Sequence, residues 1–349
     1  MRARTSITAM TNSSSICTNR RGFTLPEVML TVTILALIMP ILAVVFTSAN
    51  RGFTGFEAAN SLKQANQNTV NRMYLRLGRN KRLFQNTTDD GKFAAGADLG
   101  GCSAPMSPSA LPTIEENGTL AEGTTNFHSA SFGNSLFFGY NDAAMDLENL
   151  SDGSTTGPLR VDLYKFAYYY LTKQDSPVIL DRQTYKVAEW ESIQYADCNE
   201  IRNVSNATKR SSLIKALANA GIKACWDTSA TSYSAAFSSV TAGGTLTALA
   251  SPTIAKGRCQ QLTKVVTGIM GLSYRYGVSP NTLNWADARK TVPLYATPNG
   301  LFPSGLEVGI VGPAGGRKVF IRSVVDATSL SGGIIEDEQT VLSSARDIW

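Results

Sequence analysis

The residue with the most unusual chemical setting in this sequence is Glu27, a carboxylate near the start of an apolar stretch over residues 23–46. A charged side chain inside the hydrocarbon of a membrane costs on the order of 3 kcal/mol on insertion scales, so such residues usually mark a function. The plainer alternative is that Glu27 lies shallow enough to reach the lipid headgroups and has no partner.

Acid–base or nucleophilic catalysis would depend on His128, because it is the single histidine of the chain. His128 lies in a stretch rich in Gly and Ser, where a surface histidine is a better interpretation than the base of a Ser-His-Asp or Cys-His arrangement. Residues 312–316 lack the Lys-Ser/Thr ending of a phosphate-binding loop. We therefore assign no catalytic residue and do not expect an enzyme.

Two acidic clusters, Asp89-Asp90 and Glu336-Asp337-Glu338, raise the alternative of a calcium site. Neither cluster has the spaced carboxylates of a calcium-binding loop, so we interpret both as solvated acidic loops. The cysteines are far apart in the sequence and form no C-x-x-C pair that would suggest zinc. We expect no metal and no cofactor.

Four cysteines follow the apolar stretch, namely Cys102, Cys198, Cys225 and Cys259, and a fifth, Cys17, precedes it. An even number of cysteines on the exported side of a membrane suggests up to two disulfides, and four cysteines allow three pairings. The sequence does not choose among these pairings. Four buried free thiols are the alternative.

The apolar stretch is the element that positions Glu27. It is long enough for a membrane-spanning helix, which needs about 20 apolar residues. Arg20 and Arg21 precede it directly, so its N-terminal end should stay on the cytoplasmic side. A cleaved secretory signal would have a shorter apolar region, which makes a cut near Ser48–Ala49 unattractive.

The net charge of +5 arises in the same region of the chain. Arg2, Arg4, Arg20 and Arg21 belong to the 32 basic residues, whereas none of the 27 acidic residues lies before the apolar stretch. The remainder of the chain is therefore close to neutral, and a nucleic-acid partner is not indicated.

Residues 22–27, Gly-Phe-Thr-Leu-Pro-Glu, resemble the processing site of type IV prepilins and of type II secretion pseudopilins. The resemblance implies that prepilin peptidase cuts between Gly22 and Phe23, and that the new N-terminal Phe23 is N-methylated. It also implies that residues 1–22 are a cleaved leader. Glu27 would then pair with the Phe23 amine of a neighbouring subunit and set the register between subunits.

The expected organisation of the chain follows from this processing site. Residues 23–46 form a transmembrane helix that becomes the filament core, and residues 47–85 continue it as an amphipathic helix. Residues 86–349 form a periplasmic, β-rich globular head, with insertions near 86–130 and 197–262.

Details of the helix can also be predicted. Apolar residues recur largely at spacings of three and four and predict the seam on which the head packs: Phe56, Ala59, Leu62, Val70, Met73 and Leu77. Pro40 lies inside the span and should kink or loosen the helix. The polar stretch 86–91 is expected to end it.

The fold class is expected to be α+β and pilin-like, with a long N-terminal helix packed on an antiparallel β-sheet head that carries long loop insertions. Strands are predicted over Ser135–Tyr140, Leu159–Leu171, Val178–Trp190, Leu262–Val278, Leu306–Val311 and Lys318–Val325. A short helix is predicted at Ser212–Ala220, and residues 326–349 are predicted to be a surface tail. The run Tyr168–Tyr170 should alternate between a core face and an exposed sheet face, with a ligand platform as the alternative.

The C-terminal order of a strand, Trp285 and a final β-hairpin resembles the J-type pseudopilins of type II secretion and the PilW-type subunits of type IV pili. The length of the chain favours the PilW type. The resemblance implies a minor pilin that is processed by prepilin peptidase and helps to prime assembly or cap the filament tip. A J-type minor pseudopilin is the alternative, and a membrane-anchored periplasmic enzyme or adhesin is a distant one.

The resemblance also implies the partners and the location. The expected partners are other minor and major pilins, prepilin peptidase, the inner-membrane assembly platform and the membrane itself. The expected location is the bacterial inner membrane, with a single pass and the head in the periplasm, and later the filament.

Overall fold

The computed structural model of the 349-residue chain describes residues 24–105, 109–117, 133–147, 159–173, 185–262, 269–274, 306–329, 334–345 and 347. The chain divides into two compact units, Met1–Gly52 and Phe53–Trp349. The first unit contains the start of helix α1, and the second contains the rest of that helix and the β-rich head.

Helix α1 comprises Leu25–Leu77, and its part in the second unit is amphipathic. Leu62, Val70, Met73 and Leu77 are fully or almost fully buried, which confirms the predicted stripe over this stretch. Phe56, predicted for the same stripe, has 75% of its surface exposed. The packed face of the helix therefore begins later than the sequence pattern indicated.

The helix ends at Leu77, and the prediction that it continues to residue 85 is wrong. Gly78 follows directly and forms a turn with Arg79 because glycine is a poor helix former. Strand β1 (Asn80–Leu83) then pairs with β3 instead of extending the helix. Helix α2 (Thr88–Ala95) occupies the stretch predicted as a stop, and the Thr87 side chain caps it by accepting a hydrogen bond from the Asp90 amide.

The larger sheet has nine strands within the described residues, in the order β1-β3-β4-β6-β7-β8-β9, with β5 linking β4 to β10. The pairs are antiparallel except β6 with β7. Apart from β1, the strands are β3 (Ser135–Leu147), β4 (Leu159–Lys173), β5 (Tyr185–Ser192), β6 (Tyr195–Asp197), β7 (Ala224–Trp226), β8 (Phe237–Val240), β9 (Leu246–Ala248) and β10 (Lys256–Gln261).

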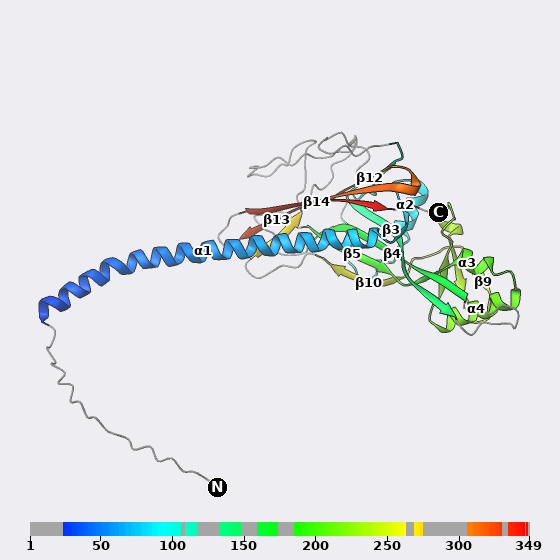
Figure 1. Ribbon diagram of the computed structural model, residues 1–349, viewed down its shortest axis with the longest axis horizontal. Helices are drawn as coiled ribbons and strands as arrows, with labels where there is room; N and C mark the ends of the chain where they lie inside the picture. The colour runs from blue at the N-terminus through cyan, green and yellow to red at the C-terminus, as the bar shows by residue number, and fades with distance from the viewer. Residues whose placement is uncertain are drawn as a thin grey trace, which may run out of the picture. The chain divides into compact units, whose positions relative to one another are not determined.

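The smaller sheet has five described strands, in which β13 pairs with β11, β12 and β14, and β12 also pairs with β2. Figure 1 shows β12, β13 and β14 in this part of the head. They are β2 (Ile114–Glu115), β11 (Ile269–Tyr274), β12 (Leu306–Val311), β13 (Arg317–Ser329) and β14 (Ile334–Ala345). The short 3-10 helix Ala314–Gly316 connects β12 to β13, in agreement with the predicted hairpin.

The C-terminal residues are not a surface tail, contrary to the prediction. Strand β14 pairs with β13 in continuous antiparallel register from Arg317↔Ala345 to Thr328↔Ile334. Asp347 beyond it is buried and forms an ion pair with Arg317. The apolar period in this stretch is weak because β14 is held by main-chain pairing at the side of a sheet.

Two apolar cores lie on opposite faces of the β3–β4 pair. Tyr169 and its alternate neighbours Ala167 and Leu171 belong to the core shared with α1, β12 and β13. Tyr168 and Tyr170 belong to a second core with Trp190 and other aromatic residues. The prediction of an exposed face for the Tyr168–Tyr170 run is therefore wrong, because α2 and residues 224–254 contribute to a core on that face as well.

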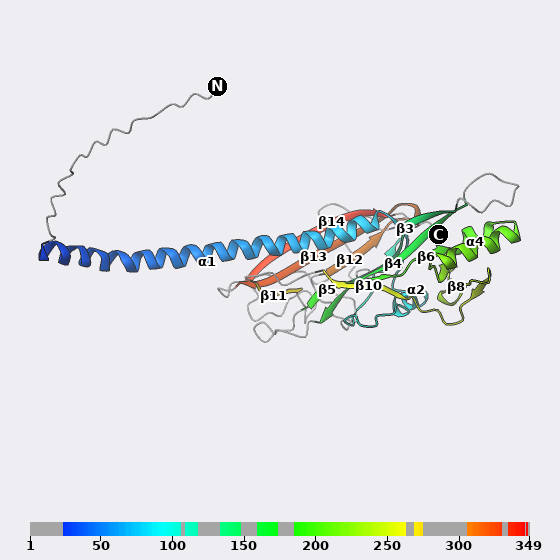
Figure 2. The same ribbon diagram turned by 90° about the horizontal axis from the view of Figure 1, so that it is seen from below.

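Residues 197–262 are a continuation of the larger sheet, whereas the sequence suggested an insertion. Strands β7 to β10 pair into that sheet, and helices α3 (Cys198–Asn203) and α4 (Ala207–Asn219) form a third core with β4 and β7. Figures 1 and 2 show α4 beside this end of the sheet. Helix α4 begins before the predicted Ser212 because Asn206 caps it, accepting from the amides of Thr208 and Lys209.

The other predicted insertion, near 86–130, is described only in part. Its described residues contain α2 and β2, and residues 118–130 lie outside the described residues, as do the predicted strand residues 178–184 and 275–278. The 3-10 helix Tyr233–Ala235 completes the elements of the head. Together, the long helix and the antiparallel sheets confirm the α+β, pilin-like fold class.

Candidate functional site

The apolar side chains in the first part of α1 are exposed. Large apolar residues from Leu25 to Phe46 have 44–76% of their surface exposed. An 18-residue window of this helix has a mean hydropathy of 2.8, and none of that window is buried in the protein. Such a surface is unfavourable in water and favourable in lipid or against other apolar helices. By length and composition, this is the described helix that could cross a membrane.

Glu27 makes hydrogen bonds within its own chain at the start of α1. Its Oε2 accepts one from the Thr24 main-chain amide at 3.0 Å and one from the Thr24 hydroxyl at 2.9 Å. This is half of a capping box, in which the residue three places into the helix binds the amide of the capping residue. This contact was not predicted, although the pattern Thr24-x-x-Glu27 is a sequence signal for it.

Hydroxyl groups inside the apolar stretch are satisfied by the helix itself. Thr31 donates to the Glu27 carbonyl at 2.6 Å, Thr33 to Met29 at 2.7 Å and Thr47 to Ala43 at 2.8 Å. Each of these hydroxyls therefore has a hydrogen-bond acceptor within the helix. This suits a surrounding of lipid or packed helices, where water is not present to accept the bond.

Other predicted residues of this region have a different status. Helix α1 is continuous through Pro40, and the kink stays a prediction. Arg20, Arg21, Gly22 and Phe23 lie outside the described residues, so the cleavage and methylation sites also stay predictions.

The second part of α1 is joined to the head by a polar seam. We define the carboxylate seam as Glu189 and Glu191 of β5 with Arg72 and Arg76 of α1. Arg72 Nε lies 2.9 Å from Glu189 Oε2, and Arg76 Nη2 donates to Glu191 Oε2 at 2.6 Å. Arg76 Nη1 also faces Glu189 as an ion pair without hydrogen-bond geometry. The helix is thus attached by charge as well as by its apolar stripe.

The two carboxylates of the seam are well satisfied. Glu189 is 1% exposed and accepts from Tyr169 Oη at 3.1 Å and Gln260 Nε2 at 2.8 Å. Burial alone would raise the pKa of Glu191, but hydrogen bonds from Lys165 and Arg76 and their charges lower it to about 2. Glu191 therefore serves as a fixed anion for the helix, and Glu189 is held beside it by its hydrogen bonds.

This seam was not predicted, although the sequence carries a signal for it. Glu189 and Glu191 alternate with the buried Trp190, which places both carboxylates on one face of a strand. Arg72 and Arg76 are four residues apart, which places them on one face of a helix. What the sequence could not provide is the evidence that these two faces meet.

A second polar contact fixes α1 to the smaller sheet. Asn66 is fully buried, and its Nδ2 donates to the Ser323 carbonyl at 3.2 Å and to Asp337 Oδ2 at 2.8 Å. The Ser323 hydroxyl donates back to Asn66 Oδ1 at 2.6 Å. A buried amide that is satisfied in this way specifies one rotation and one axial position of the helix against the sheet.

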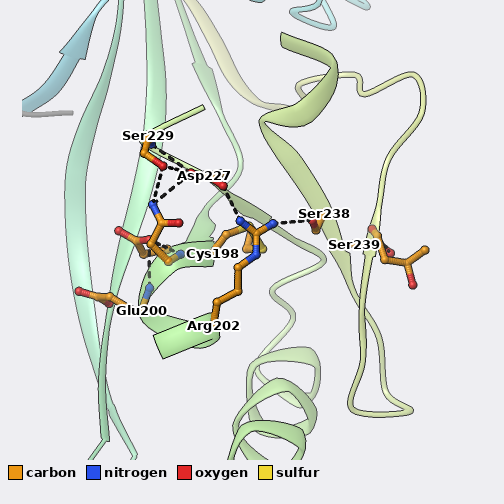
Figure 3. Close-up of a disulfide and its surroundings, with 11 residues drawn as sticks. Cys198, Glu200, Arg202, Asp227, Ser229, Ser238 and Ser239 are labelled. Atoms are coloured by element: carbon orange, nitrogen blue, oxygen red, sulfur yellow. Dashed lines mark hydrogen bonds and ion pairs between the residues drawn. A yellow bond between two sulfur atoms is a disulfide. The ribbon is translucent and has the colours of Figure 1, made fainter. Parts of the chain in front are cut away.

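A disulfide joins Cys198 at the start of α3 to Cys225 in β7 (Figure 3). The S–S distance is 2.01 Å and the Cα atoms are 5.0 Å apart. Close by, Arg202 of α3 forms an ion pair with Asp227, whose Oδ1 accepts from Asn199 Nδ2 at 3.1 Å. Two of the four predicted cysteines are therefore paired.

Cys102 and Cys259 are free thiols in the structure, and both are partly exposed.

The acidic clusters considered for calcium are engaged in other contacts. Asp90 pairs with Arg82 at 3.0 Å, and Asp89 pairs with Lys92 at 3.2 Å. In β14, Asp337 accepts from Asn66 and Glu338 pairs with Arg322. Over the described part of the chain, no group of three or more His, Cys, Asp or Glu residues could hold a metal ion. His128 lies outside that part.

Comparison with known proteins gives one match. Residues 17–39 match the family model of the prokaryotic N-terminal methylation motif. No curated protein and no solved structure matched the chain. The motif supports a type IV prepilin-like protein, either pilin-like or a pseudopilin, and together with the exposed apolar helix it suggests a membrane-anchored protein with a single pass.

Proposed function

We propose that this chain is a minor pilin of a type IV pilus, a structural subunit that has no catalytic role. The observation that carries the proposal is the helix start: the methylation motif runs directly into an apolar stretch whose side chains are exposed from Leu25 to Phe46. A helix of this kind needs an apolar surrounding at every stage, which a membrane provides before assembly and neighbouring helices provide afterwards.

Processing and assembly follow from this helix. Prepilin peptidase removes residues 1–22, and Phe23 becomes the methylated N-terminus. Because lipid tails and apolar helix faces are alike as surroundings, transfer from membrane to filament costs little for the apolar side chains. The exception is Glu27, because an unpaired carboxylate is unfavourable in an apolar surrounding. An ion pair with the Phe23 amine of a neighbouring subunit stabilises it and fixes the axial register between the two subunits.

The head lies in the periplasm, and the subunit acts with other minor and major pilins and the inner-membrane assembly platform to prime assembly or cap the tip. The carboxylate seam and Asn66 support this role, because they attach the head to α1, the helix that would pack in the filament.

The corresponding role in type II secretion, a J-type minor pseudopilin, has the same helix and the same processing. Deletion of the gene separates the two: loss of pili with normal secretion favours the minor pilin, and loss of secretion with normal pili favours the pseudopilin. A membrane-anchored enzyme or adhesin would change neither.

The decisive experiment for the proposal is N-terminal analysis of the mature protein. The full chain is expressed in membranes with active prepilin peptidase, and with an inactive peptidase as the control. We expect an N-methylated Phe23 terminus and the loss of residues 1–22 only with the active enzyme. A chain that stays full-length beside the active peptidase would remove the basis of the proposal.

A further inference from the structure

One segment of the head, which we call the strap and define as residues 97–105, is attached to strands β4, β5 and β10. At its start, the Asp98 amide donates to the Ile254 carbonyl at 2.9 Å, and Trp190 Nε1 donates to the Asp98 carbonyl at 2.8 Å. Near its end, the Thr172 hydroxyl donates to the Ala104 carbonyl at 2.9 Å. The strap is therefore held to β4, to β5 and to Ile254 just before β10, and Cys102 lies within it.

The free thiols meet where the strap crosses β10. Cys259 is in β10 and lies opposite Trp190 of β5 in the strand register. Cys102 packs against the second core, which contains Trp190, and the thiol of Cys259 lies close enough to raise the pKa of the Cys102 thiol. Two further contacts hold this place on the strap: Tyr170 Oη donates to the Ser103 carbonyl at 2.8 Å, and Lys256 Nζ donates to the Gly100 carbonyl.

We propose that Cys102 and Cys259 form a second disulfide of the head, which covalently attaches the strap to β10. Because the strap and β10 hold the two thiols as neighbours, a small approach of their sulfur atoms brings them to bonding distance. Because Cys198 and Cys225 already form one pair, this pairing uses all four cysteines that follow the apolar stretch. It also selects one of the three pairings that the sequence left open.

The bond forms by exchange with an oxidised dithiol of a thiol–disulfide oxidant. One cysteine, as a thiolate, attacks the disulfide of the oxidant and releases one oxidant thiol. The second cysteine then attacks this mixed disulfide, the Cys102–Cys259 bond forms, and the second oxidant thiol leaves. Two protein thiols are oxidised and one oxidant disulfide is reduced to two thiols, so atoms and electrons balance.

Burial influences when this exchange occurs. It raises the pKa of the Cys102 thiol to about 12, with the neighbouring Cys259 adding to the effect. A thiol with so high a pKa is a slow nucleophile because little of it is thiolate near neutral pH. The exchange is therefore fastest while the head folds, before the surroundings of Cys102 in the folded head raise this pKa.

The second disulfide would protect the aromatic core on the face of the sheet away from α1. Without it, the strap is held by the hydrogen bonds described above. With it, a loop much longer than the 27-residue separation of Cys198 and Cys225 is closed, and closure of longer loops restricts the unfolded chain more.

The inference rests on the proposed function, because an exported head is needed to meet an oxidant. The test uses the full-length chain in membranes, with free thiols alkylated during denaturing lysis, followed by peptide mapping without reductant. The same sample is read for its N-terminus. We expect linked peptides for Cys102–Cys259 and for Cys198–Cys225, together with a processed N-terminus.

Each other outcome has a definite meaning. Alkylated Cys102 and Cys259 beside a linked Cys198–Cys225 would overturn the second disulfide and leave the proposed function intact. Links between the pairs, such as Cys102 with Cys225, would also overturn it. All four cysteines alkylated would overturn both the second disulfide and the periplasmic location, and an unprocessed N-terminus would count against the proposed function alone.

Variants give an independent check that does not depend on mapping. Cys102→Ala and Cys259→Ala should each lower the thermal midpoint, and the double variant should lower it no further than the larger single effect, because either change removes the same bond. Each single variant should also expose one alkylatable thiol that the parent lacks. Additive shifts in the midpoint, or the same alkylation in parent and variants, would contradict the bond. Cys198→Ala serves as the matched control for loss of an established disulfide.

Discussion

At the scale of single residues, Glu27 has two alternative partners. In the structure, its carboxylate binds the amide and hydroxyl of Thr24 and so caps the helix of its own chain. In the proposed filament it binds the amine of a neighbour. Both contacts suit an anion at a helix N-terminus, where the helix dipole favours negative charge. In the proposed membrane stage before assembly, the two bonds to Thr24 satisfy the carboxylate.

The two partners of Glu27 can be separated by mutation. Glu27→Ala should still be cleaved by prepilin peptidase but should enter filaments less, because the carboxylate that pairs between subunits is lost. Thr24→Ala loses the capping hydroxyl but keeps that carboxylate, so it should enter filaments nearly as well as the parent. Immunoblots of sheared filaments against whole membranes measure both. Normal incorporation of Glu27→Ala, or an equal defect in both variants, would contradict the register role.

Glu307 gives a prediction about pH. Burial raises the pKa of this carboxyl to about 7, against the opposing charge of Arg322 at 3.3 Å. Because the folded pKa lies above the unfolded value, the stabilisation is complete below pH about 4.5 and is lost as the pH rises towards 7. We expect the free energy of unfolding to fall over this window, by at most about 1.4 kcal/mol per pH unit.

Urea unfolding of the detergent-solubilised protein at several pH values measures this slope. Glu307→Gln removes the titrating group and should flatten the profile between pH about 5 and 7. Glu191 titrates in the opposite sense, since its pKa of about 2 makes its contribution fade only in stronger acid, so its effect does not overlap this window. An unchanged slope in Glu307→Gln would contradict the assignment.

At the scale of elements, the joint between α1 and the head combines an apolar stripe with buried charge. The stripe buries Leu62, Val70, Met73 and Leu77, whereas the carboxylate seam and Asn66 specify one orientation of the helix. An apolar stripe alone would tolerate sliding by a turn, because the buried positions repeat every three or four residues. Paired charges and a satisfied amide do not repeat, so they select one position.

Removal of one partner from the seam should therefore be costly. Glu189→Ala leaves Arg72 and Arg76 facing a site without its most buried anion, and breaking such a pair costs about 3 kcal/mol. Thermal or urea unfolding of the purified full chain measures the loss. Lys92→Ala, at the exposed pair with Asp89, is the control and should change stability by less than about 0.5 kcal/mol. Equal effects of the two variants would show that the seam adds no more than a surface ion pair.

At the scale of the whole molecule, the chain has two units that differ in how their apolar side chains are placed. Met1–Gly52 contains the exposed apolar helix, whereas Phe53–Trp349 contains the three apolar cores of the head. The second unit includes the buried stripe of α1 from Leu62 onward, so it has the residues needed to complete its own core.

This division predicts the behaviour of truncated chains. A chain of residues 53–349 should be soluble without detergent and should unfold cooperatively, because its cores are complete. A chain of residues 70–349 lacks Leu62 and Asn66 and should be less stable or aggregate. Soluble yield and thermal unfolding by circular dichroism compare the two. Aggregation of the longer chain would contradict a self-sufficient head.

Some of these features could be predicted from local sequence. The apolar stretch, the processing motif and the main strands were predictable because they depend on short patterns of residue type. The boundaries that failed, at Leu77 and at the C-terminus, depend on pairing between distant strands: β1 ends the helix by binding β3, and β14 is a strand because β13 lies beside it.

Pairing between distant side chains was likewise decided by the tertiary structure. Cys198 and Cys225 pair because parallel contact of β6 with β7 brings α3 beside β7, and no spacing rule in the sequence predicts that. Glu189 meets Arg76 only when the helix lies on the sheet. The local residue types therefore suffice to predict the apolar helix and the unusual setting of Glu27. Long-range packing, which depends on the whole chain, decides which side chains hold the head to that helix.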